Sequence, residues 1–315
     1  MTNLQKGILS TAAGGLCWGF SGMVSQHLLT SQNMNPLLLS TFRMLGAGIL
    51  LFIFLQFKKK EKLWEIWKDP SSSKRLIQFA LFGLTFNSIT FLATIQYTNA
   101  GTATIMQYLS AIIILVCSAV YYRRLPKRNE ITALVLAVAG VYLIATGGSP
   151  GELAVSPLGL TIGVVSAAAL ALYNVLPVKI LGKYGSLVIT CWGMLIGGIV
   201  LAVFYQPWNH LPEITSSFIV NTLIVIVLGT VLPYALYLKG IALIGPVKAS
   251  MIIAVEPISA TAFAAVILGT NFSIADLAGF VCVLSSIFFL AERKKKRKRK
   301  RERLQEEGIY SYEDR

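Results

Sequence analysis

Two ionisable side chains, Arg43 and Glu256, stand inside long apolar stretches of the sequence. Charges at membrane depth are costly and usually face a cavity or another helix. A carboxylate placed there can take up and release a proton, and a guanidinium can guide an anionic group. Either side chain could instead be a structural pin, paired with a backbone carbonyl or with the other charge. Pro257 follows Glu256 directly and removes one helical hydrogen bond beside it.

Polar and aromatic side chains recur at helical spacing in the same apolar stretches. They suit hydrogen bonding to a small polar solute, although packing through small residues explains many of the serines and glycines among them. We assign charge or proton coupling to Glu256 and Arg43. We predict that the substrate-binding residues are Trp18, Asn87, Thr94, Gln107, Tyr108, Tyr173, Asn174, Tyr234 and Tyr237.

Enzyme and metal chemistry have little support in the sequence. The four cysteines have no CxxC spacing, and neither histidine has a carboxylate at ligand spacing. The stretch Gly19-Phe20-Ser21-Gly22 resembles the nucleophile motif of rhomboid-type proteases, but these also need a histidine deep on another helix. The P-loop pattern GxxxxGK[ST] is absent. We therefore expect a protein that is not an enzyme and binds no cofactor or metal.

Ten apolar blocks must position these side chains. Most are long enough to cross a hydrocarbon core of roughly 30 Å as helices, which satisfy their own backbone hydrogen bonds in lipid. Charged residues make up 13 % of the chain, against roughly 25 % in a typical soluble protein. The fold predicted is therefore an all-α integral membrane protein. Its blocks lie near 6–28, 36–57, 76–98, 100–122, 129–147, 156–181, 184–206, 218–238, 246–268 and 274–291.

The basic residues alternate with these blocks. When the N-terminus is placed inside, 27 of the 28 lysines and arginines fall on the inner side, and Arg43 is the exception. This is the positive-inside pattern, and it predicts a multi-pass plasma-membrane protein with both termini in the cytoplasm. The net charge of +14 then reflects topology, and we expect the basic tail at 292–315 to bind anionic lipid rather than nucleic acid. Segment 58–75, with Trp64 and Trp67 among lysines, predicts a short interfacial helix or an aromatic belt.

The chain divides into two weakly similar halves, 1–147 and 156–291. An offset of 146 residues aligns Glu130 with Asp276, and an offset of 150 aligns Gly48 with Gly198. Each half holds five blocks, so the second half enters the membrane from the opposite side. The sequence therefore predicts two inverted-topology five-helix repeats, an architecture typical of secondary transporters.

Short motifs in five of the blocks resemble the drug/metabolite transporter superfamily, in its EamA branch of ten-helix exporters. The chain departs from the family pattern at Ala111, where proline is common, and at Thr270, where glutamate is common. The resemblance implies a cavity between the halves and alternating access. It is carried by Leu16-Cys17-Trp18-Gly19, Thr41-Phe42-Arg43, Gln107-Tyr108-Leu109-Ser110, Val255-Glu256-Pro257-Ile258 and Asp276-Leu277-Ala278-Gly279.

Together these features favour a secondary transporter, an exporter by resemblance, for small polar metabolites such as amino acids. The hydrogen-bonding candidates Gln107, Asn87 and Asn174 favour a metabolite over a bulky drug. Two alternatives stay open at this point: a passive channel or facilitator, and a membrane scaffold that acts through its basic tail. Coupling of transport to a proton gradient would separate a transporter from a channel, and deletion of the tail would separate it from a scaffold.

Overall fold

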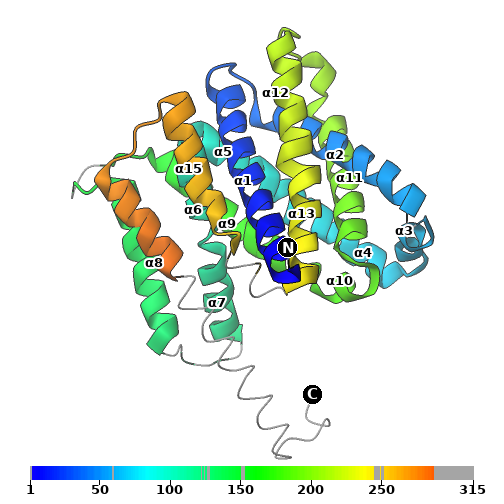
Figure 1. Ribbon diagram of the computed structural model, residues 1–315, viewed down its shortest axis with the longest axis horizontal. Helices are drawn as coiled ribbons and strands as arrows, with labels where there is room; N and C mark the ends of the chain where they lie inside the picture. The colour runs from blue at the N-terminus through cyan, green and yellow to red at the C-terminus, as the bar shows by residue number, and fades with distance from the viewer. Residues whose placement is uncertain are drawn as a thin grey trace, which may run out of the picture.

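The structure, a computed structural model, describes residues 2–286 apart from 59, 122, 124, 126, 127, 150–152, 245–248, 250 and 251. The basic tail at 292–315 lies outside these residues. Figure 1 shows a bundle of packed helices, and no strand occurs in the described part of the chain. The first helices along the chain are α1 (Asn3–Thr30), α2 (Pro36–Lys58), α3 (Lys60–Glu65), η1 (Ile66–Lys68), α4 (Pro70–Gln78), η2 (Phe79–Thr85), α5 (Phe86–Tyr97), α6 (Ala100–Gln107), α7 (Ser110–Tyr121) and α8 (Arg128–Thr146). They are followed by α9 (Pro157–Val175), α10 (Val178–Tyr184), α11 (Ser186–Tyr205), η3 (Pro207–Asn209), α12 (Ser216–Ile226), η4 (Val227–Val231), α13 (Leu232–Ile244), α15 (Val255–Leu268) and a helix at Ile274–Ser286.

Within the described residues, 8 helical stretches are long and apolar enough to span a membrane. Two shorter apolar helices, Val255–Leu268 and Ile274–Ser286, follow them. Large apolar side chains such as Phe57 and Phe204 are exposed on the outside of the bundle, as expected for a surface that faces lipid. The prediction of an all-helical membrane protein is confirmed. The arrangement of ten helices as two inverted repeats stays a prediction.

Local capping fixes where several helices begin. Thr2 and Gln5 form a capping box, in which each side chain accepts a hydrogen bond from the other residue's backbone N–H. Asn99 caps α6 by accepting from the backbone N–H of Thr102 at 2.8 Å. Such caps satisfy the N–H groups that a helix start leaves unpaired. Asp69 caps α4 before Pro70, so this helix begins six residues before the apolar block predicted at 76–98.

Two of the membrane helices contain π-helical turns, η2 and η4. In each turn a threonine hydroxyl donates to the carbonyl oxygen five residues earlier. Thr85 donates to Ala80 at 2.7 Å, and Thr230 donates to Val225 at 3.4 Å. A π-turn inserts one extra residue into the helix, rotates the side chains that follow, and is common at functional sites.

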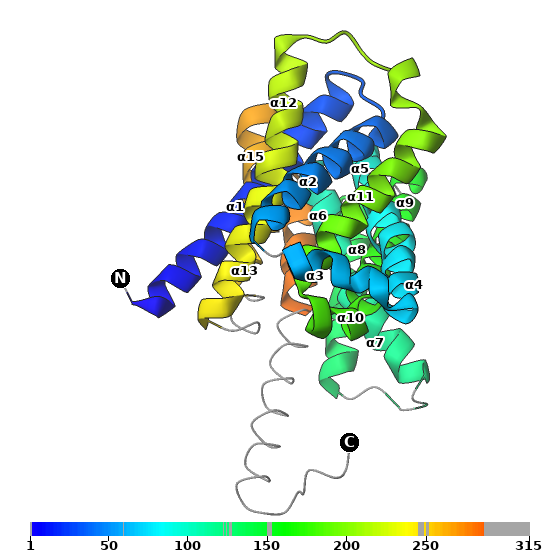
Figure 2. The ribbon, with the colours of Figure 1, turned by 90° about the vertical axis from the view of Figure 1, so that its right-hand side faces the viewer.

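Glycines allow the helices to cross closely. A Cβ added to Gly48 on α2 would meet Leu195 at 3.0 Å, and one added to Gly198 on α11 would meet Leu45 at 2.9 Å. The α2–α11 crossing therefore consists of two reciprocal glycine–leucine contacts. Figure 2 shows a second close pair, α1 and α13, which Gly14 of α1 permits by packing against the backbone at Pro233. Small residues at such crossings are the usual means by which membrane helices pack.

The connection between α2 and α4 folds back onto α11. Leu63 and Ile66 are fully buried in the apolar cluster formed with α2 and α11. The Trp192 indole N–H donates to the carbonyl oxygen of Leu63 at 2.8 Å. The rings of Trp64 and Trp67 stand edge-on to the Trp192 ring, at centroid distances of 5.2 Å and 5.1 Å. The short helix predicted in this segment is present, and its apolar face packs on the protein.

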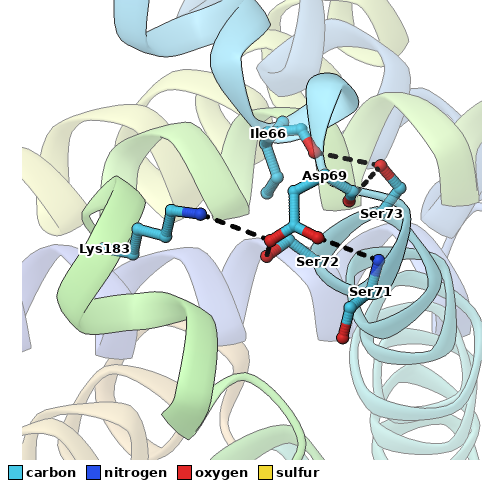
Figure 3. A network of polar contacts seen from close by, with 6 residues as sticks. All are labelled: Ile66, Asp69, Ser71, Ser72, Ser73 and Lys183. Atoms are coloured by element: carbon cyan, nitrogen blue, oxygen red, sulfur yellow. Dashed lines mark hydrogen bonds and ion pairs between the residues drawn. The ribbon is translucent and has the colours of Figure 1, made fainter.

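An exposed ion pair ties the same connection to the second part of the chain (Figure 3). The Lys183 ammonium lies 3.3 Å from Asp69 Oδ2. Asp69 also accepts from the Ser71 backbone N–H at 3.1 Å and from the Ser72 hydroxyl at 2.7 Å. The hydrogen bond from Ser72 and the Lys183 charge lower the pKa of Asp69, because both stabilise its ionised form.

Candidate functional site

A cavity of about 270 Å³, with charged, amide and aromatic groups among its lining residues, lies between helices from both parts of the chain. Its volume is just below the roughly 300–1,000 Å³ of sites for drug-sized ligands, so it suits a small solute. The side chains and glycines that line it come from most of the membrane helices. They are Trp18, Ser21, Gly22, Ser25, Arg43, Met44, Leu84, Asn87, Ser88, Phe91, Gln107, Leu170, Tyr173, Met194, Gly229, Tyr234, Tyr237 and Glu256.

Arg43 reaches this cavity from α2 and is held by the π-turn η4. Its Nε donates to Thr230 Oγ1 at 3.1 Å, and its Nη2 donates to the carbonyl oxygen of Gly229 at 3.4 Å. Because a π-turn shifts the backbone hydrogen-bond ladder, carbonyl oxygens there become accessible to other donors. From the sequence, Arg43 could pair with a backbone carbonyl or with Glu256. The structure shows the pairing with a backbone carbonyl, that of Gly229.

Glu256 lies in the first turn of α15 and also lines the cavity. The helix starts only at Val255, and the Glu256 backbone N–H donates to the carbonyl oxygen of Ile253 at 2.9 Å. Pro257 therefore falls in a first turn, where its missing N–H costs little. Among the described residues, no hydrogen bond or ion pair reaches the Glu256 carboxylate. The positive end of the α15 dipole favours a negative charge at this position.

A hydrogen-bonded amide pair forms one wall of the cavity. Gln107 Nε2 donates to Asn87 Oδ1 at 2.8 Å and to Ser166 Oγ at 3.1 Å. These bonds join α6, α5 and α9, so they fix both amides in one orientation. A fixed amide presents a defined set of donors and acceptors to a solute.

Aromatic rings form another wall. The Trp18 ring meets Tyr234 edge-on at a centroid distance of 5.3 Å and an interplanar angle of 87°. It meets Tyr237 at 5.8 Å and 56°. The Tyr234 and Tyr173 hydroxyls are hydrogen-bonded at 2.9 Å. The cavity thus has opposite charges, a fixed amide pair and an aromatic wall, all suited to a small polar or charged solute.

The structure brings most of the predicted site residues to this cavity. Thr94, Tyr108 and Asn174 are not among its lining residues. Thr94 is fully buried and its hydroxyl donates to the Thr90 carbonyl oxygen at 2.7 Å. Tyr108 packs against an apolar cluster around Ile105 and Phe280. Asn174 is exposed on α9 and donates to the Leu170 carbonyl oxygen at 2.8 Å. The residues that do line it are Trp18, Asn87, Gln107, Tyr173, Tyr234, Tyr237, Arg43 and Glu256.

Sequence reasoning missed Ser88 and Gly229 as lining residues. Ser88 follows η2, whose extra residue rotates the helix beyond it and changes which positions share a face. Gly229 contributes its backbone carbonyl oxygen, and neither composition nor residue spacing predicts which backbone groups will line a cavity. The repeated pattern of a glycine close to a threonine, Gly83 with Thr85 and Gly229 with Thr230, was the available signal.

Comparison with known proteins decides the family. The EamA-like transporter family matches residues 5–146 and 157–291. The chain belongs to the EamA-like transporter family.

Relatives of this EamA-like transporter extend over nearly its whole length. It is 33% identical over 291 residues to an uncharacterized inner membrane transporter, YicL, of Salmonella typhimurium, covering 92% of this chain and 97% of the relative. An uncharacterized transporter of Clostridium kluyveri is 25% identical, with 93% and 95% covered. Protein PecM of Dickeya dadantii is 23% identical, with 89% and 92% covered.

The fold has a counterpart among solved structures. One crystal structure of a protein superposes with a TM-score of 0.60 at 14% identity, covering 92% of this chain and 98% of the other. At this identity the likeness concerns the fold alone. The family match and the apolar helices together make this transporter a multi-pass helical membrane protein.

Proposed function

We propose that this EamA-like protein is a secondary transporter that exports small polar metabolites, amino acids first among them, by alternating access. The observation that carries the proposal is the cavity with Arg43 and Glu256 on its lining. A zwitterion would satisfy both charges, whereas an apolar drug would leave them unpaired at membrane depth. Export is the direction that the family resemblance favours.

Within this proposal, the lining residues have different roles in binding the solute and in coupling. Asn87, Gln107, Trp18 and the tyrosines Tyr173, Tyr234 and Tyr237 would bind the solute. Glu256 would exchange a proton or a cationic group, and Arg43 would hold an anionic group. The roles predicted for Thr94, Tyr108 and Asn174 remain proposals at positions outside the lining, and Tyr108 still interacts electrostatically with Glu256 and Tyr237.

Alternating access would use two inverted repeats. Three features support this arrangement: the π-turns η2 and η4 begin 148 residues apart, at Phe79 and Val227, the glycine–leucine contacts between α2 and α11 are reciprocal, and the family matches two segments of similar length. Rocking of one repeat against the other would open the cavity to each side in turn.

The membrane and topology belong to the same proposal. The basic residues favour a plasma-membrane protein with both termini in the cytoplasm. The basic run that follows the last helix would bind the anionic headgroups of the inner leaflet.

The proposal is tested with the purified chain in sealed lipid vesicles. Labelled amino acids are offered to vesicles loaded with the same unlabelled compound, and a proton gradient is imposed in a second series. We expect saturable counterflow, lost in Arg43→Gln and kept in the matched variant Arg75→Gln, whose residue lies on α4 outside the cavity lining. Flux that never saturates and shows no exchange would indicate a channel. Loss of all flux after deletion of residues 293–315, with the rest correctly folded, would favour a scaffold.

A further inference from the structure

The aromatic wall of the cavity is built for a particular kind of positive group. Trp18 comes from α1, and Tyr234 and Tyr237 come from α13. The ring of Trp18 contacts both tyrosine rings, and all three residues line the cavity. Aromatic faces attract cations through their quadrupole, and clustered rings of this type bind alkylated ammonium groups.

The negative charge on the cavity lining, Glu256, interacts electrostatically with Arg43 but has no contacting partner within the described residues. Glu256 lines the same cavity, yet its carboxylate makes no ion pair or hydrogen bond there. An ionised carboxylate at membrane depth needs a counter-charge or a proton. A ligand cation between the rings and Glu256 would supply the counter-charge.

Arg43, the positive charge on the cavity lining, is positioned to bind an anion. Thr230 and Gly229 accept from Nε and Nη2 of Arg43. A guanidinium has five N–H donors, so three are left over after these two bonds. Planar donors of this type bind a carboxylate in a bidentate manner. The cavity therefore offers one site for a carboxylate and one for a cation.

Several hydroxyl and amide donors nearby are already used within the protein, and the Glu256 carboxylate is a free acceptor of the cavity among the described residues. The Tyr234 and Tyr173 hydroxyls bond to each other at 2.9 Å. Ser25 donates to the Ser21 carbonyl oxygen at 2.8 Å, and Gln107 donates to Asn87. A primary ammonium brings three N–H donors that all need acceptors, whereas a fully alkylated ammonium brings none.

We propose that the cavity prefers a small zwitterion with an N-alkylated ammonium, its carboxylate on Arg43 and its ammonium between Trp18, Tyr237 and Glu256. This inference rests on the proposed function, because it names the substrate class of the same site. Such a substrate differs from an ordinary amino acid in the methyl groups on its ammonium, which would contact the aromatic rings.

Binding to the purified full-length chain tests the proposal. Isothermal titration is performed with glycine, N-methylglycine, N,N-dimethylglycine and glycine betaine, which share a carboxylate and differ only in methylation. We expect affinity to rise along the series, with glycine betaine about tenfold tighter than glycine. Choline, which has the same trimethylammonium group without a carboxylate, should bind more weakly than glycine betaine.

Variants separate the two ends of the ligand. Trp18→Leu should reduce the ratio of betaine affinity to glycine affinity, and Tyr237→Leu tests the same wall if Trp18→Leu does not fold. Trp208→Leu is the matched control, since Trp208 is exposed on η3, between α11 and α12. Arg43→Gln should abolish the preference for glycine betaine over choline.

Two results would overturn the inference: equal affinity along the methylation series, or an unchanged affinity ratio in Trp18→Leu. If glycine or another amino acid still shows saturable counterflow in vesicles, the proposed transport function stands and only this substrate class fails. Absence of saturable exchange for every compound in the correctly folded protein would overturn the proposed function and this inference with it.

Discussion

Arg43 and Thr230, 187 residues apart in the chain, are joined by a hydrogen bond of 3.1 Å from Nε to Oγ1. The bond links α2 to the π-turn η4 and aims the guanidinium at the cavity. The other π-turn, η2, has a similar threonine, Thr85, which packs against Gly197. The residue that aligns with Arg43 in the second half is Gly193, so only one of the two π-turns holds an arginine.

This difference gives a matched pair of variants. Thr230→Val keeps the side-chain shape and removes the bond to Arg43, so the guanidinium loses one of its two anchors. We expect KM for an anionic or zwitterionic substrate to rise about tenfold, because a hydrogen bond to a charged group contributes about 1.5–3 kcal/mol. Thr85→Val removes only the bond to Ala80 and should change KM little. Equal KM values for the two variants in counterflow assays would argue against a positioning role for Thr230.

The membrane fold could be predicted from the sequence because two of its causes are local. The length of each apolar block indicates a membrane span, and the alternation of basic residues predicts the topology. The two charges of the cavity were equally visible, since Arg43 and Glu256 are rare types in apolar stretches. The partners of Arg43 were not visible, because Thr230 and Gly229 are common residues whose position depends on a π-turn.

Two predicted site residues that lie outside the cavity lining share a local bonding pattern. Thr94 and Asn174 were chosen for their polar side chains, yet both hydroxyl and amide bond back to a carbonyl four residues earlier in their own helix. Such back-bonding satisfies a polar group without any cavity. Spacing along one helix cannot distinguish it from a cavity-lining role, because the rotation of each helix depends on its neighbours.

The reciprocal α2–α11 contacts predict similar costs for equivalent substitutions. Gly48→Ala and Gly198→Ala each place a methyl group against a leucine of the facing helix, so both should destabilise the protein by about 1–3 kcal/mol. Gly182→Ala is the control, since an added Cβ there meets nothing within 4 Å. Unfolding midpoints in detergent would measure all three. A loss for Gly182→Ala as large as for the other two would contradict this account.

The pair of Asp69 and Lys183 predicts a pH-dependent contribution to stability. Because the folded-state pKa of Asp69 is lowered, its contribution is present above the ordinary aspartate value of about 3.9 and is lost as pH falls through the lowered folded value. Asp69→Asn retains the helix cap, since asparagine caps as well as aspartate. We expect a small decrease in the unfolding midpoint at pH 7 that disappears as the pH falls through the lowered folded-state pKa of Asp69. The pair is exposed, so added salt should also reduce the difference. A difference that persists unchanged at low pH would rule out the charge as its cause.

Membrane topology can be tested with single cysteines in a chain whose four native cysteines are replaced by serine. Gln305→Cys lies in the basic tail and His210→Cys lies in the loop before α12. A membrane-impermeant thiol reagent added to intact cells should label residue 210 and not residue 305. Labelling at residue 305 from outside would reject the placement of both termini in the cytoplasm.

Glu256 provides the sharpest test of coupling. Its carboxylate lines the cavity and interacts electrostatically with Arg43, but it makes no ion pair or hydrogen bond among the described residues, so a solute or a proton can bind directly to it. Burying a charged carboxylate costs far more than burying a neutral one, so its protonation would differ between states that expose the cavity and states that close it. Glu256→Gln keeps the shape and removes the titration. We expect loss of proton-driven transport while exchange of substrate for substrate is retained.

The control for this variant is Asp276→Asn, because Asp276 lies outside the cavity and its carboxylate accepts from the Ser273 backbone N–H at 2.8 Å. Asp276→Asn should keep gradient-driven transport. Normal pH-dependent transport by Glu256→Gln would refute the proton site. Failure of Glu256→Gln to fold would mark Glu256 as a structural residue. Because Arg43 donates to Thr230 and Gly229 and makes no ion pair with Glu256, Arg43→Gln should not rescue that folding defect. Rescue would instead reveal a direct pairing of the two charges in another state of the transport cycle.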